Sequence, residues 1–417
     1  MRVHFLTHGC KANQYDTEKY RQELEARGAR LAATLGDADA VVINTCTVTN
    51  QADVEARKAI RKIGRTKPDV KIVVAGCSAA MRADDYRAMD EVYGVVAGQD
   101  AVQVADALLP DAILRDEESI GGELLSMNRL RSRGWLKVQD GCNRRCSFCA
   151  TRIARGESRS RDIESLVAEA EILSDAHREL VITGVHIGHY GLDLNGRKSD
   201  EFSLSKLMAR LLEAVPNTRF RLGSIEATEI DDLMVDLMAS PGSQLAPHFH
   251  IPMQSGSDHV LRAMKRWHTR EQYRRRVLEI AERVPGLGLG ADIIVGFPTE
   301  GEEHHAETRA LVEELPFTYL HVFPYSERSG TPAAEMSGHL PGDVKSARSQ
   351  ELRDIAHAKG TEHMRRRAGT VADIVLEQGD LGITEDYLRV RMSGDWSEDR
   401  VTARLDMAGD DLCALPL

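Results

Sequence analysis

Apolar and polar positions in the first hundred residues alternate between two spacings. Apolar runs of strand length occupy residues 3–10, 40–46, 71–77 and 93–98. Between them, residues 13–28 and 50–69 carry apolar side chains at helical spacing and end near Gly or Pro. This alternation predicts a doubly wound sheet of parallel strands in an N-terminal α/β domain, residues 1–115.

A second and longer series of the same kind follows between residues 128 and 358. Its runs of strand length lie at 135–141, 179–185, 219–224, 248–253, 290–296 and 318–323. Helical spacing separates them at 163–177, 203–215, 229–240, 257–284 and 301–315. Such repeats predict a partial (β/α)6 barrel, whose active site lies at the carboxyl ends of its strands. Residues 101–127, acidic and weakly periodic, are the expected boundary before it.

The last stretch, residues 360–417, changes to alternating apolar and polar positions with Gly-containing turns. The alternation covers residues 369–379, 383–394 and 399–409. It predicts a small C-terminal domain formed by an antiparallel β-barrel.

Three cysteines fall where the predicted N-terminal strands end. Cys10, Cys46 and Cys77 each close one apolar run, and ligands of open parallel sheets bind outside the carboxyl ends of the strands. Free cysteine is commonly buried in cores, but core cysteines would fall anywhere along a strand. The placement therefore favours a ligand site built from three residues far apart in sequence.

Three more cysteines lie within eight positions after the first strand of the predicted barrel. The stretch "GCNRRCSFC" gives Cys142, Cys146 and Cys149 a C-x3-C-x2-C spacing. Thiolates select zinc, copper(I) or iron–sulfur clusters, and structural zinc requires a fourth protein ligand that this loop lacks. Three thiolates on a [4Fe–4S] cluster leave one iron open to an exchangeable ligand. This spacing and strand position form the radical SAM signature, so the three cysteines are the predicted catalytic centre.

The remaining strand ends of the barrel supply candidate contacts to S-adenosylmethionine. They occur in "TGVHIG", "GSIEATE", "MQSGSD" and "ADIIVGFPTE". The predicted cofactor-binding residues are Gly184, His186, Ser224, Glu226, Gly256, Asp292 and Gly296. Each glycine could equally serve its βα turn alone.

Charge and composition narrow the class of partner. The chain of 417 residues has a net charge of −11, which argues against a uniformly basic nucleic-acid binder. Residues 129–161 nevertheless contain ten Lys or Arg against two acids. The arginines that follow the cysteine loop are predicted to contact RNA phosphates, although some could pair with nearby acids: Arg152, Arg155, Arg159 and Arg161. Apolar runs are far shorter than the ~20 residues of a membrane span, so a cytoplasmic protein is expected.

Several motifs together resemble those of the methylthiotransferases, radical SAM enzymes with a C-terminal TRAM domain. The matching stretches are "GCKANQYDTE", "VINTCTVT", "VAGC", "GCNRRCSFC", "ARGESRSR", "HFHIPMQSGSDHVLRAMKRWHT", "DIIVGFPTE" and "FPYSERSGTPAA". The resemblance covers essentially the whole chain. It implies a second [4Fe–4S] cluster on Cys10, Cys46 and Cys77 that takes part in sulfur delivery, with S-adenosylmethionine as the other cofactor.

The same resemblance implies a substrate. "GCKANQYDTE", "ITGVHIGHYG" and "FPYSERSGTPAA" look most like the branch that modifies threonylcarbamoyladenosine at position 37 of tRNA, beside the anticodon. Partners would be the tRNA anticodon loop and an electron donor such as flavodoxin or ferredoxin. The alternatives are isopentenyladenosine in tRNA, an aspartate of a ribosomal protein, or a non-catalytic iron–sulfur redox protein. His8 and "CATRIARG" depart from the usual family pattern.

Overall fold

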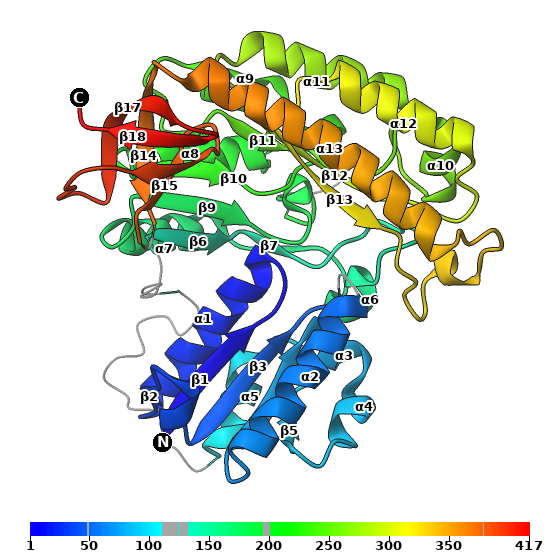
Figure 1. The fold of residues 1–417 in the computed structure, drawn as a ribbon. Helices are drawn as coiled ribbons and strands as arrows, with labels where there is room; N and C mark the ends of the chain where they lie inside the picture. The colour runs from blue at the N-terminus through cyan, green and yellow to red at the C-terminus, as the bar shows by residue number, and fades with distance from the viewer. Residues whose placement is uncertain (48–49, 111–124, 126–131, 195–200, 378) are drawn as a thin grey trace. The chain divides into compact units, whose positions relative to one another are not determined.

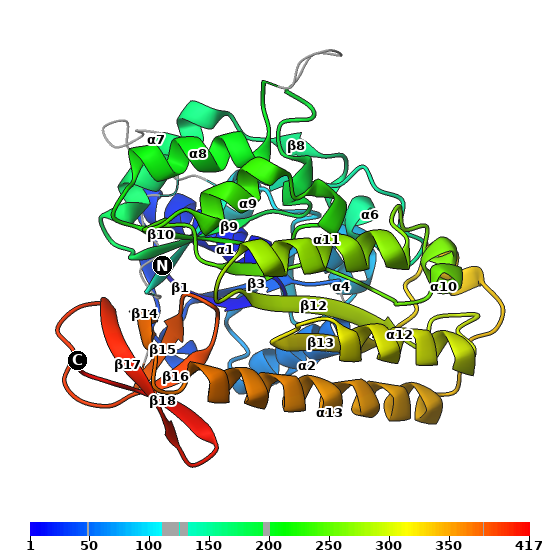
Figure 2. The ribbon, with the colours of Figure 1, turned by 90° about the horizontal axis from the view of Figure 1, so that it is seen from above.

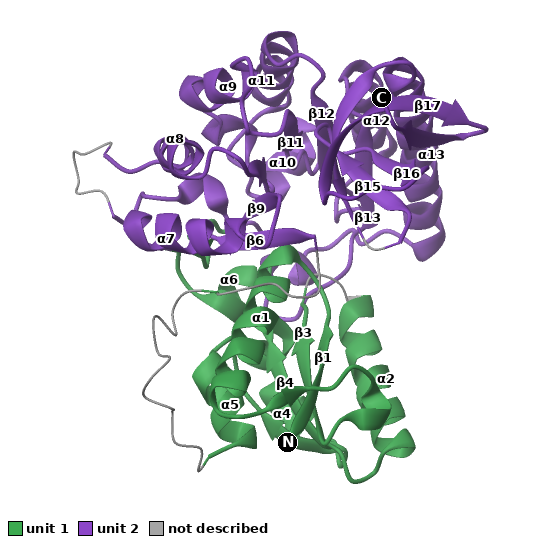
Figure 3. Ribbon diagram, turned by 90° about the vertical axis from the view of Figure 1, so that its left-hand side faces the viewer, with its two compact units in different colours: residues 1–127, 139–145, 149–159 green, residues 128–138, 146–148, 160–417 purple. Residues whose placement is uncertain are grey.

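The structure is a computed structural model that describes the chain except residues 48–49, 111–124, 126–131, 195–200 and 378. Two units are distinguished in Figure 3, and the division passes through the cysteine loop. Unit 1 contains residues 1–127, 139–145 and 149–159, and unit 2 contains residues 128–138, 146–148 and 160–417. Most of the expected boundary at 101–127 lies outside the described residues, and the domain limits 1–115, 128–358 and 360–417 stay predictions.

Unit 1 is built on a parallel sheet with the strand order β2-β1-β3-β4-β5. The strands are β1 (Arg2–Thr7), β2 (Arg30–Leu31), β3 (Ala40–Thr45), β4 (Lys71–Gly76) and β5 (Val92–Val95). The helices are α1 (Lys11–Ala26), α2 (Asn50–Thr66), α3 (Cys77–Met81), α4 (Ala83–Arg87), α5 (Ala101–Leu108) and α6 (Thr151–Arg155), with η1 at Leu35–Asp37. Figure 1 shows the strands of this sheet running side by side in blue.

Both faces of this sheet are buried. Val42 and Val73 pack with Leu24 of α1 and Val104 of α5 in one apolar cluster. The residues that alternate with them along the strands pack on the other face, against α2 and α4: Val41, Ile43, Ile72 and Val74 with Ile60, Ile63 and Tyr86. The predicted doubly wound arrangement is confirmed, because β3 and β4 contribute apolar side chains to both clusters.

Unit 2 contains the predicted partial barrel. Its parallel strands are β6 (Arg133–Lys137), β9 (Glu179–Thr183), β10 (Arg219–Leu222), β11 (His248–His250), β12 (Gly288–Val295) and β13 (Tyr319–Pro324). They pair as β10-β9-β6 and β11-β12-β13. Isolated bridges from Phe220 to Leu245 and from Ser224 to His250 join the two groups.

Helices connect the barrel strands and cover their outer side (Figures 1 and 2). They are α7 (Ile163–Ser174), α8 (Leu204–Ala214), α9 (Asp232–Ala239), α10 (Asp258–Ala263), α11 (Arg270–Arg283) and α12 (Glu302–Glu314). Short elements of unit 2 are η2 (Ile187–His189), η3 (Ala227–Glu229) and η4 (Pro332–Glu335), whereas β7 (Gln139–Asp140) belongs to unit 1 and the division between the units falls within β8 (Arg159–Ser160). The single helical stretch expected at 257–284 is two helices, because Lys265 has a φ of +55° and Thr269 starts α11 in a capping box with Gln272.

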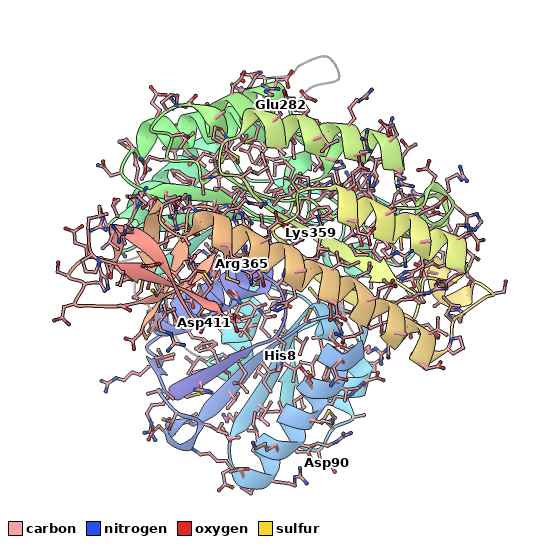
Figure 4. The ribbon with its side chains drawn as sticks, turned by 45° about the horizontal axis from the view of Figure 1, so that its top comes forward. His8, Asp90, Glu282, Lys359, Arg365 and Asp411 are labelled. Carbon is pink, nitrogen blue, oxygen red and sulfur yellow. The ribbon has the colours of Figure 1, made fainter. Side chains whose placement is uncertain are left out.

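Helix α13 (Gly342–Arg367) leads from the barrel to the C-terminal strands and packs against β13 (Figure 2). Figure 4 labels Lys359 and Arg365 on this helix. Lys359 donates to the carbonyl oxygens of Glu313 at 2.8 Å and Leu315 at 2.9 Å, which ties α13 to the end of α12.

The C-terminal strands close into the predicted small barrel. They are β14 (Val371–Leu376), β15 (Leu381–Thr384), β16 (Arg389–Met392), β17 (Arg400–Ala408) and β18 (Asp411–Leu415), in the order β14-β15-β16-β18-β17. One pair, β16 with β18, is parallel, whereas the sequence predicts an antiparallel barrel throughout. Asp411, labelled in Figure 4, starts β18.

A buried ion cluster joins this small barrel to the larger one. Arg219 and Arg221 of β10 both donate to the carboxylate of Glu179 on β9. The same guanidinium groups also donate to main-chain carbonyls of Ile383 and Thr384. Because these charged groups are paired and hydrogen-bonded, they can be buried at the junction without an uncompensated charge.

Candidate cysteine-based active site

The structure places the three N-terminal cysteines at the carboxyl ends of three parallel strands. Cys10 follows β1 and is the N-cap of α1, while Cys46 and Cys77 come directly after β3 and β4. Cys46 and Cys77 are buried, and Cys10 is exposed.

Asn13 ties these strand ends together. Its side-chain Nδ2 donates to the carbonyl oxygens of His8 at 2.8 Å and Thr45 at 2.9 Å. Its Oδ1 lies 3.6 Å from Cys77 Sγ, and its main-chain oxygen accepts from Asn44. A single fully buried side chain from α1 therefore fixes the segments that carry all three cysteines. His8, the residue that departs from the family pattern, accepts from Asn13 through its main chain, and Figure 4 labels it.

Two glycines leave room for this convergence. A Cβ on Gly9 would lie 2.6 Å from both Cβ and Sγ of Cys46, and the φ of Gly9 is +105°. A Cβ on Gly76 would lie 2.2 Å from Asn44 Oδ1, and its φ is +95°. Both positions exclude a side chain and adopt the left-handed region that favours glycine.

The pKa of Cys77 also reports that the three thiols lie close together. Burial raises the pKa of Cys77 to about 12, and Cys10 and Cys46 act in the same direction, whereas Arg155 lowers it. Three converging thiols fit an iron–sulfur cluster, which binds through cysteine thiolates.

The second group of cysteines lies in the loop after β7. Cys142, Cys146 and Cys149 are each partly exposed. Main-chain N–H groups donate to two of the sulfur atoms, from Arg144 to Cys142 and from Thr151 to Cys149, each at 3.4 Å. Hydrogen bonds of this kind to the sulfur atoms are a feature of iron–sulfur sites, so these thiols also fit a [4Fe–4S] cluster.

Within unit 2, Arg266 connects the second cysteine of this loop to the barrel. Its Nη1 lies 3.6 Å from Cys146 Sγ, and its Nη2 pairs with the carboxylate of Glu226. Burial raises the pKa of Glu226, although Arg266 opposes that shift. Arg266 Nε is buried and has no hydrogen-bond partner among the described residues. An orphan donor beside a cysteine ligand fits the carboxylate of a bound amino acid group such as that of S-adenosylmethionine.

Two other predicted cofactor residues lie in histidine-rich clusters. His186 Nε2 lies 2.7 Å from Glu229, whose carboxylate also contacts His189 at 3.2 Å, and the two imidazoles stack at 3.9 Å. Asp292 contacts His250 at 3.0 Å and His321 at 3.2 Å. Burial alone would raise the pKa of Asp292, but hydrogen bonds from the two histidines outweigh it and lower the pKa.

The other predicted cofactor residues have less distinctive surroundings. Ser224 is exposed and Gly184 half-buried. Gly256 packs on α12, where an added Cβ would lie 2.6 Å from Thr308 Cα, and Gly296 packs on the side chain of Lys345. The turn and packing account for both glycines, and their contact with S-adenosylmethionine stays a prediction.

The predicted RNA-binding arginines divide by accessibility. Arg159 is exposed and Arg152 half-buried, so both can reach a partner. Arg161 donates to Glu169 at 2.8 Å and 3.2 Å. Arg155 is only 1% exposed and pairs with Asp16 and Asp140. Burial contradicts the prediction that Arg155 contacts RNA, because its donors are already taken inside unit 1.

The sequence pattern does not single out Asn13, Arg266, His189 or Glu229. In the motif "MKRWHT", Arg266 stands next to a tryptophan, and this neighbour is the one local feature that could have drawn attention to it. Trp267 lies under the Arg266 guanidinium at 4.2 Å from the ring centroid. The partners of Asn13, Arg266 and Glu229 lie in other elements, which the local pattern does not identify.

Comparisons with known proteins cover nearly all of the chain. Residues 2–98 match a family described as "Uncharacterized protein family UPF0004", and residues 136–312 match the "Radical SAM superfamily". The threonylcarbamoyladenosine tRNA methylthiotransferase MtaB of Rickettsia prowazekii is 36% identical over 403 aligned positions, and the alignment covers 94% of this chain and 91% of the relative. The protein of that name from Bacillus subtilis is 36% identical over 422 aligned positions, and that alignment covers 96% of this chain and 91% of the relative.

A more distant relative and a solved structure extend the comparison. The tRNA-2-methylthio-N(6)-dimethylallyladenosine synthase of Staphylococcus aureus is 32% identical over 364 aligned positions, and the alignment covers 83% of this chain and 69% of the relative. The radical S-adenosylmethionine methyltransferase TsrM of Kitasatospora setae, solved with cobalamin and a [4Fe–4S] cluster, superposes with a TM-score of 0.56. It is 15% identical, with 80% of this chain and 74% of that chain covered, so it shows a shared fold. Among the described residues, no helix combines the length and apolarity that a membrane crossing requires.

Proposed function

The chain belongs to the radical SAM methylthiotransferase family, and from this premise we propose that it inserts a methylthio group at C2 of N6-threonylcarbamoyladenosine at position 37 of tRNA. The observation that carries the substrate is the similarity to two proteins of that name, at 36% identity over almost the full length of both chains. The relative named for dimethylallyladenosine is more distant and covers less of the chain.

The cysteines of the loop after β7 are proposed to hold the catalytic cluster. Cys142, Cys146 and Cys149 would hold a [4Fe–4S] cluster, which when bound would supply the electron for cleavage of S-adenosylmethionine. Arg266 would bind the carboxylate of that cofactor through its unpartnered Nε, and Glu226 would orient the guanidinium. The proposed contacts from the other strand ends remain Gly184, His186, Ser224, Gly256, Asp292 and Gly296.

The three N-terminal cysteines are proposed to hold the second cluster, at which sulfur for insertion is delivered. Support comes from the donor set of Cys10, Cys46 and Cys77, which is sulfur only. The buried surroundings of Cys46 and Cys77 keep water away from sulfur chemistry, while the exposed Cys10 marks the side open to a partner.

Contacts with the anticodon stem and loop are proposed on two surfaces. Arg152 and Arg159 remain candidates after the cysteine loop. The outer face of α2 adds exposed basic residues at helical spacing: Lys58, Arg61, Lys62 and Arg65. Within the described part of the chain, none of these four forms an ion pair with a carboxylate. Unpaired cations aligned over about 10 Å suit successive phosphates of an RNA strand. An electron donor such as flavodoxin or ferredoxin and a cytoplasmic location complete the proposal.

Analysis of modified nucleosides tests the substrate. The chain would be expressed in a bacterium whose own methylthiotransferase gene for threonylcarbamoyladenosine has been deleted, and tRNA nucleosides measured by mass spectrometry. We expect the methylthio derivative of threonylcarbamoyladenosine to return and isopentenyladenosine to be unchanged. Methylthiolation of isopentenyladenosine, or of a ribosomal-protein aspartate with no change in tRNA, would instead assign one of the two alternatives. A Cys142→Ala variant serves as the inactive control.

A further inference from the structure

Arg155 makes several hydrogen bonds within unit 1, and RNA binding does not account for them. Its Nε donates to Cys77 Sγ at 3.1 Å. Nη1 donates to the two carboxylate oxygens of Asp140 at 3.0 Å and 3.2 Å, and Nη2 donates to Asn13 Oδ1 at 2.6 Å and Asp16 Oδ2 at 2.7 Å. These bonds use all the N–H donors that a guanidinium has.

The acceptors come from separate parts of the sequence. Asn13 and Asp16 belong to α1, Cys77 starts α3, and Asp140 precedes the cysteine loop. Arg155 itself ends α6, the short helix after that loop, and α6 packs on α3 within unit 1 (Figure 1). The side chain therefore connects the segment that follows Cys149 to the sulfur atom of Cys77.

The charges around this contact are unusual for a buried site. The buried guanidinium is paired with the carboxylate of Asp16 at 2.7 Å and with that of Asp140 at 3.0 Å. Arginine therefore stays charged, and its planar fork matches acceptors on several sides in a way that lysine cannot. Gln99 also points a donor at the same sulfur, but at 3.7 Å and without a charge.

We propose that Arg155 is a positioning residue for the second cluster: it fixes the orientation of Cys77 and stabilises the reduced cluster through a charged N–H···S hydrogen bond. The inference rests on the proposed second cluster at Cys10, Cys46 and Cys77. A cluster gains negative charge on reduction, so a fixed positive charge and hydrogen bonds to its sulfur ligands raise its reduction potential. The segment that follows the catalytic cysteines thus also sets the electronic properties of the other cluster.

A redox titration of the second cluster tests this role apart from catalysis. A full-length background with Cys142, Cys146 and Cys149 changed to Ser keeps the N-terminal group of cysteines to bind iron after anaerobic reconstitution, with Cys413 as the one other cysteine of the chain. In this background, Arg155→Gln is compared with Arg87→Gln, which removes the same charge from an exposed site of unit 1. Iron and sulfide content and the midpoint potential by electron paramagnetic resonance are measured.

We expect the midpoint potential of Arg155→Gln to move to a more negative value while Arg87→Gln keeps that of the background. Arg155→Lys, which retains the charge but not the fork, should give a smaller shift in the same direction. If Arg155→Gln does not fold, Arg155→Lys decides alone. Unchanged potentials in a variant with full iron content would overturn the inference. A background that binds no iron would instead refute the proposed second cluster, so the two failures are distinguishable.

Discussion

Arg155 and Arg266 both approach a cysteine sulfur, but their surroundings differ in one decisive respect. Arg155 donates to Cys77 at 3.1 Å and has every donor occupied by the chain. Arg266 lies 3.6 Å from Cys146 and keeps a buried Nε without a partner among the described residues. A closed site of the first kind holds protein parts in place, whereas an open site of the second kind awaits a ligand. This difference is the basis on which we propose a structural and electronic role for Arg155 and cofactor binding for Arg266.

The largest expected effect separates the two groups of cysteines themselves. Cys142→Ala should abolish formation of 5′-deoxyadenosine from S-adenosylmethionine under reducing, anaerobic conditions, because the catalytic cluster loses a ligand. Cys46→Ala should leave that cleavage measurable while blocking insertion of sulfur into tRNA. Both products are measured by chromatography and mass spectrometry. Equal loss of cleavage in both variants would contradict two separable clusters.

Removal of Arg155, whose donors are all occupied, should lower the free energy of unfolding. Arg155→Met leaves Asp16 and Asp140 without their buried cation, and breaking a buried ion pair by removing one partner costs about 3–5 kcal/mol. Hydrogen exchange followed by mass spectrometry should show faster exchange in α1 and α3, with Arg87→Met as the exposed control. The affinity for S-adenosylmethionine should stay as in the wild type. Wild-type exchange in α1 and α3 would show that the closed network is not structural.

Removal of the open arginine should instead cost cofactor binding. Arg266→Met loses a hydrogen bond to a charged group, worth about 1.5–3 kcal/mol, which corresponds to a Kd for S-adenosylmethionine roughly ten- to a hundred-fold weaker. The pKa of Glu226 is already raised by burial, so this carboxyl can take up a proton when its partner is removed. Stability should therefore change less than in Arg155→Met.

Calorimetry on anaerobically loaded protein measures the affinity. Arg262→Met on α10 is the matched control, since Arg262 is exposed, and Arg266→Lys tests whether charge alone suffices. The same Kd in Arg266→Met and the control would remove the proposed role and with it the contrast between the two arginines.

The contrast between the arginines also shows what a sequence can reveal here. The cysteine loop is a local pattern within eight positions, and the strand-end cysteines follow from the regular ends of parallel strands, so both groups are predictable. The sequence assigns Arg155 to RNA because its neighbours along the chain are basic. Its actual partners Asn13 and Asp16 lie on α1, 142 and 139 positions away, and only the tertiary fold of unit 1 brings them to it.

Helix α13 shows the same limit at the level of fold. Its 26 residues escape prediction although the strands before and after it are found. The buried side includes Arg348, Ser349 and His363 beside Leu352 and Ala356, so no apolar stripe at helical spacing marks it. The buried Arg348 donates to the carboxylate of Glu302 on α12 and to that of Glu300 in the turn before α12. These partners compensate the burial of its charge. When buried polar side chains find their hydrogen-bond partners far away in the sequence, the helix has no hydrophobic pattern by which the sequence could predict it.

The smallest expected effect concerns charges without an ion-pair partner among the described residues, on the exposed basic face of α2. Arg61→Glu/Arg65→Glu should weaken binding of tRNA about five- to ten-fold, or ~1–1.4 kcal/mol. The dependence of log Kd on log salt concentration should become shallower by about one for each phosphate that the variant no longer neutralises. Filter binding at several salt concentrations measures both quantities.

A matched pair of substitutions separates a local interaction from overall charge. Arg30→Glu/Arg87→Glu changes the net charge by the same amount at exposed positions of unit 1 away from α2. If this control weakens tRNA binding as much as the α2 variant does, the loss of affinity comes from the more negative net charge of the chain and not from contacts of α2. If only the α2 variant loses affinity and salt dependence, the exposed arginines of α2 bind tRNA locally. Arginines whose N–H donors are not all used within the chain would then mark ligand-binding positions both on α2 and at Arg266. Arg155, whose N–H donors are all used within the chain, would then be the arginine that stabilises the fold and positions the second cluster.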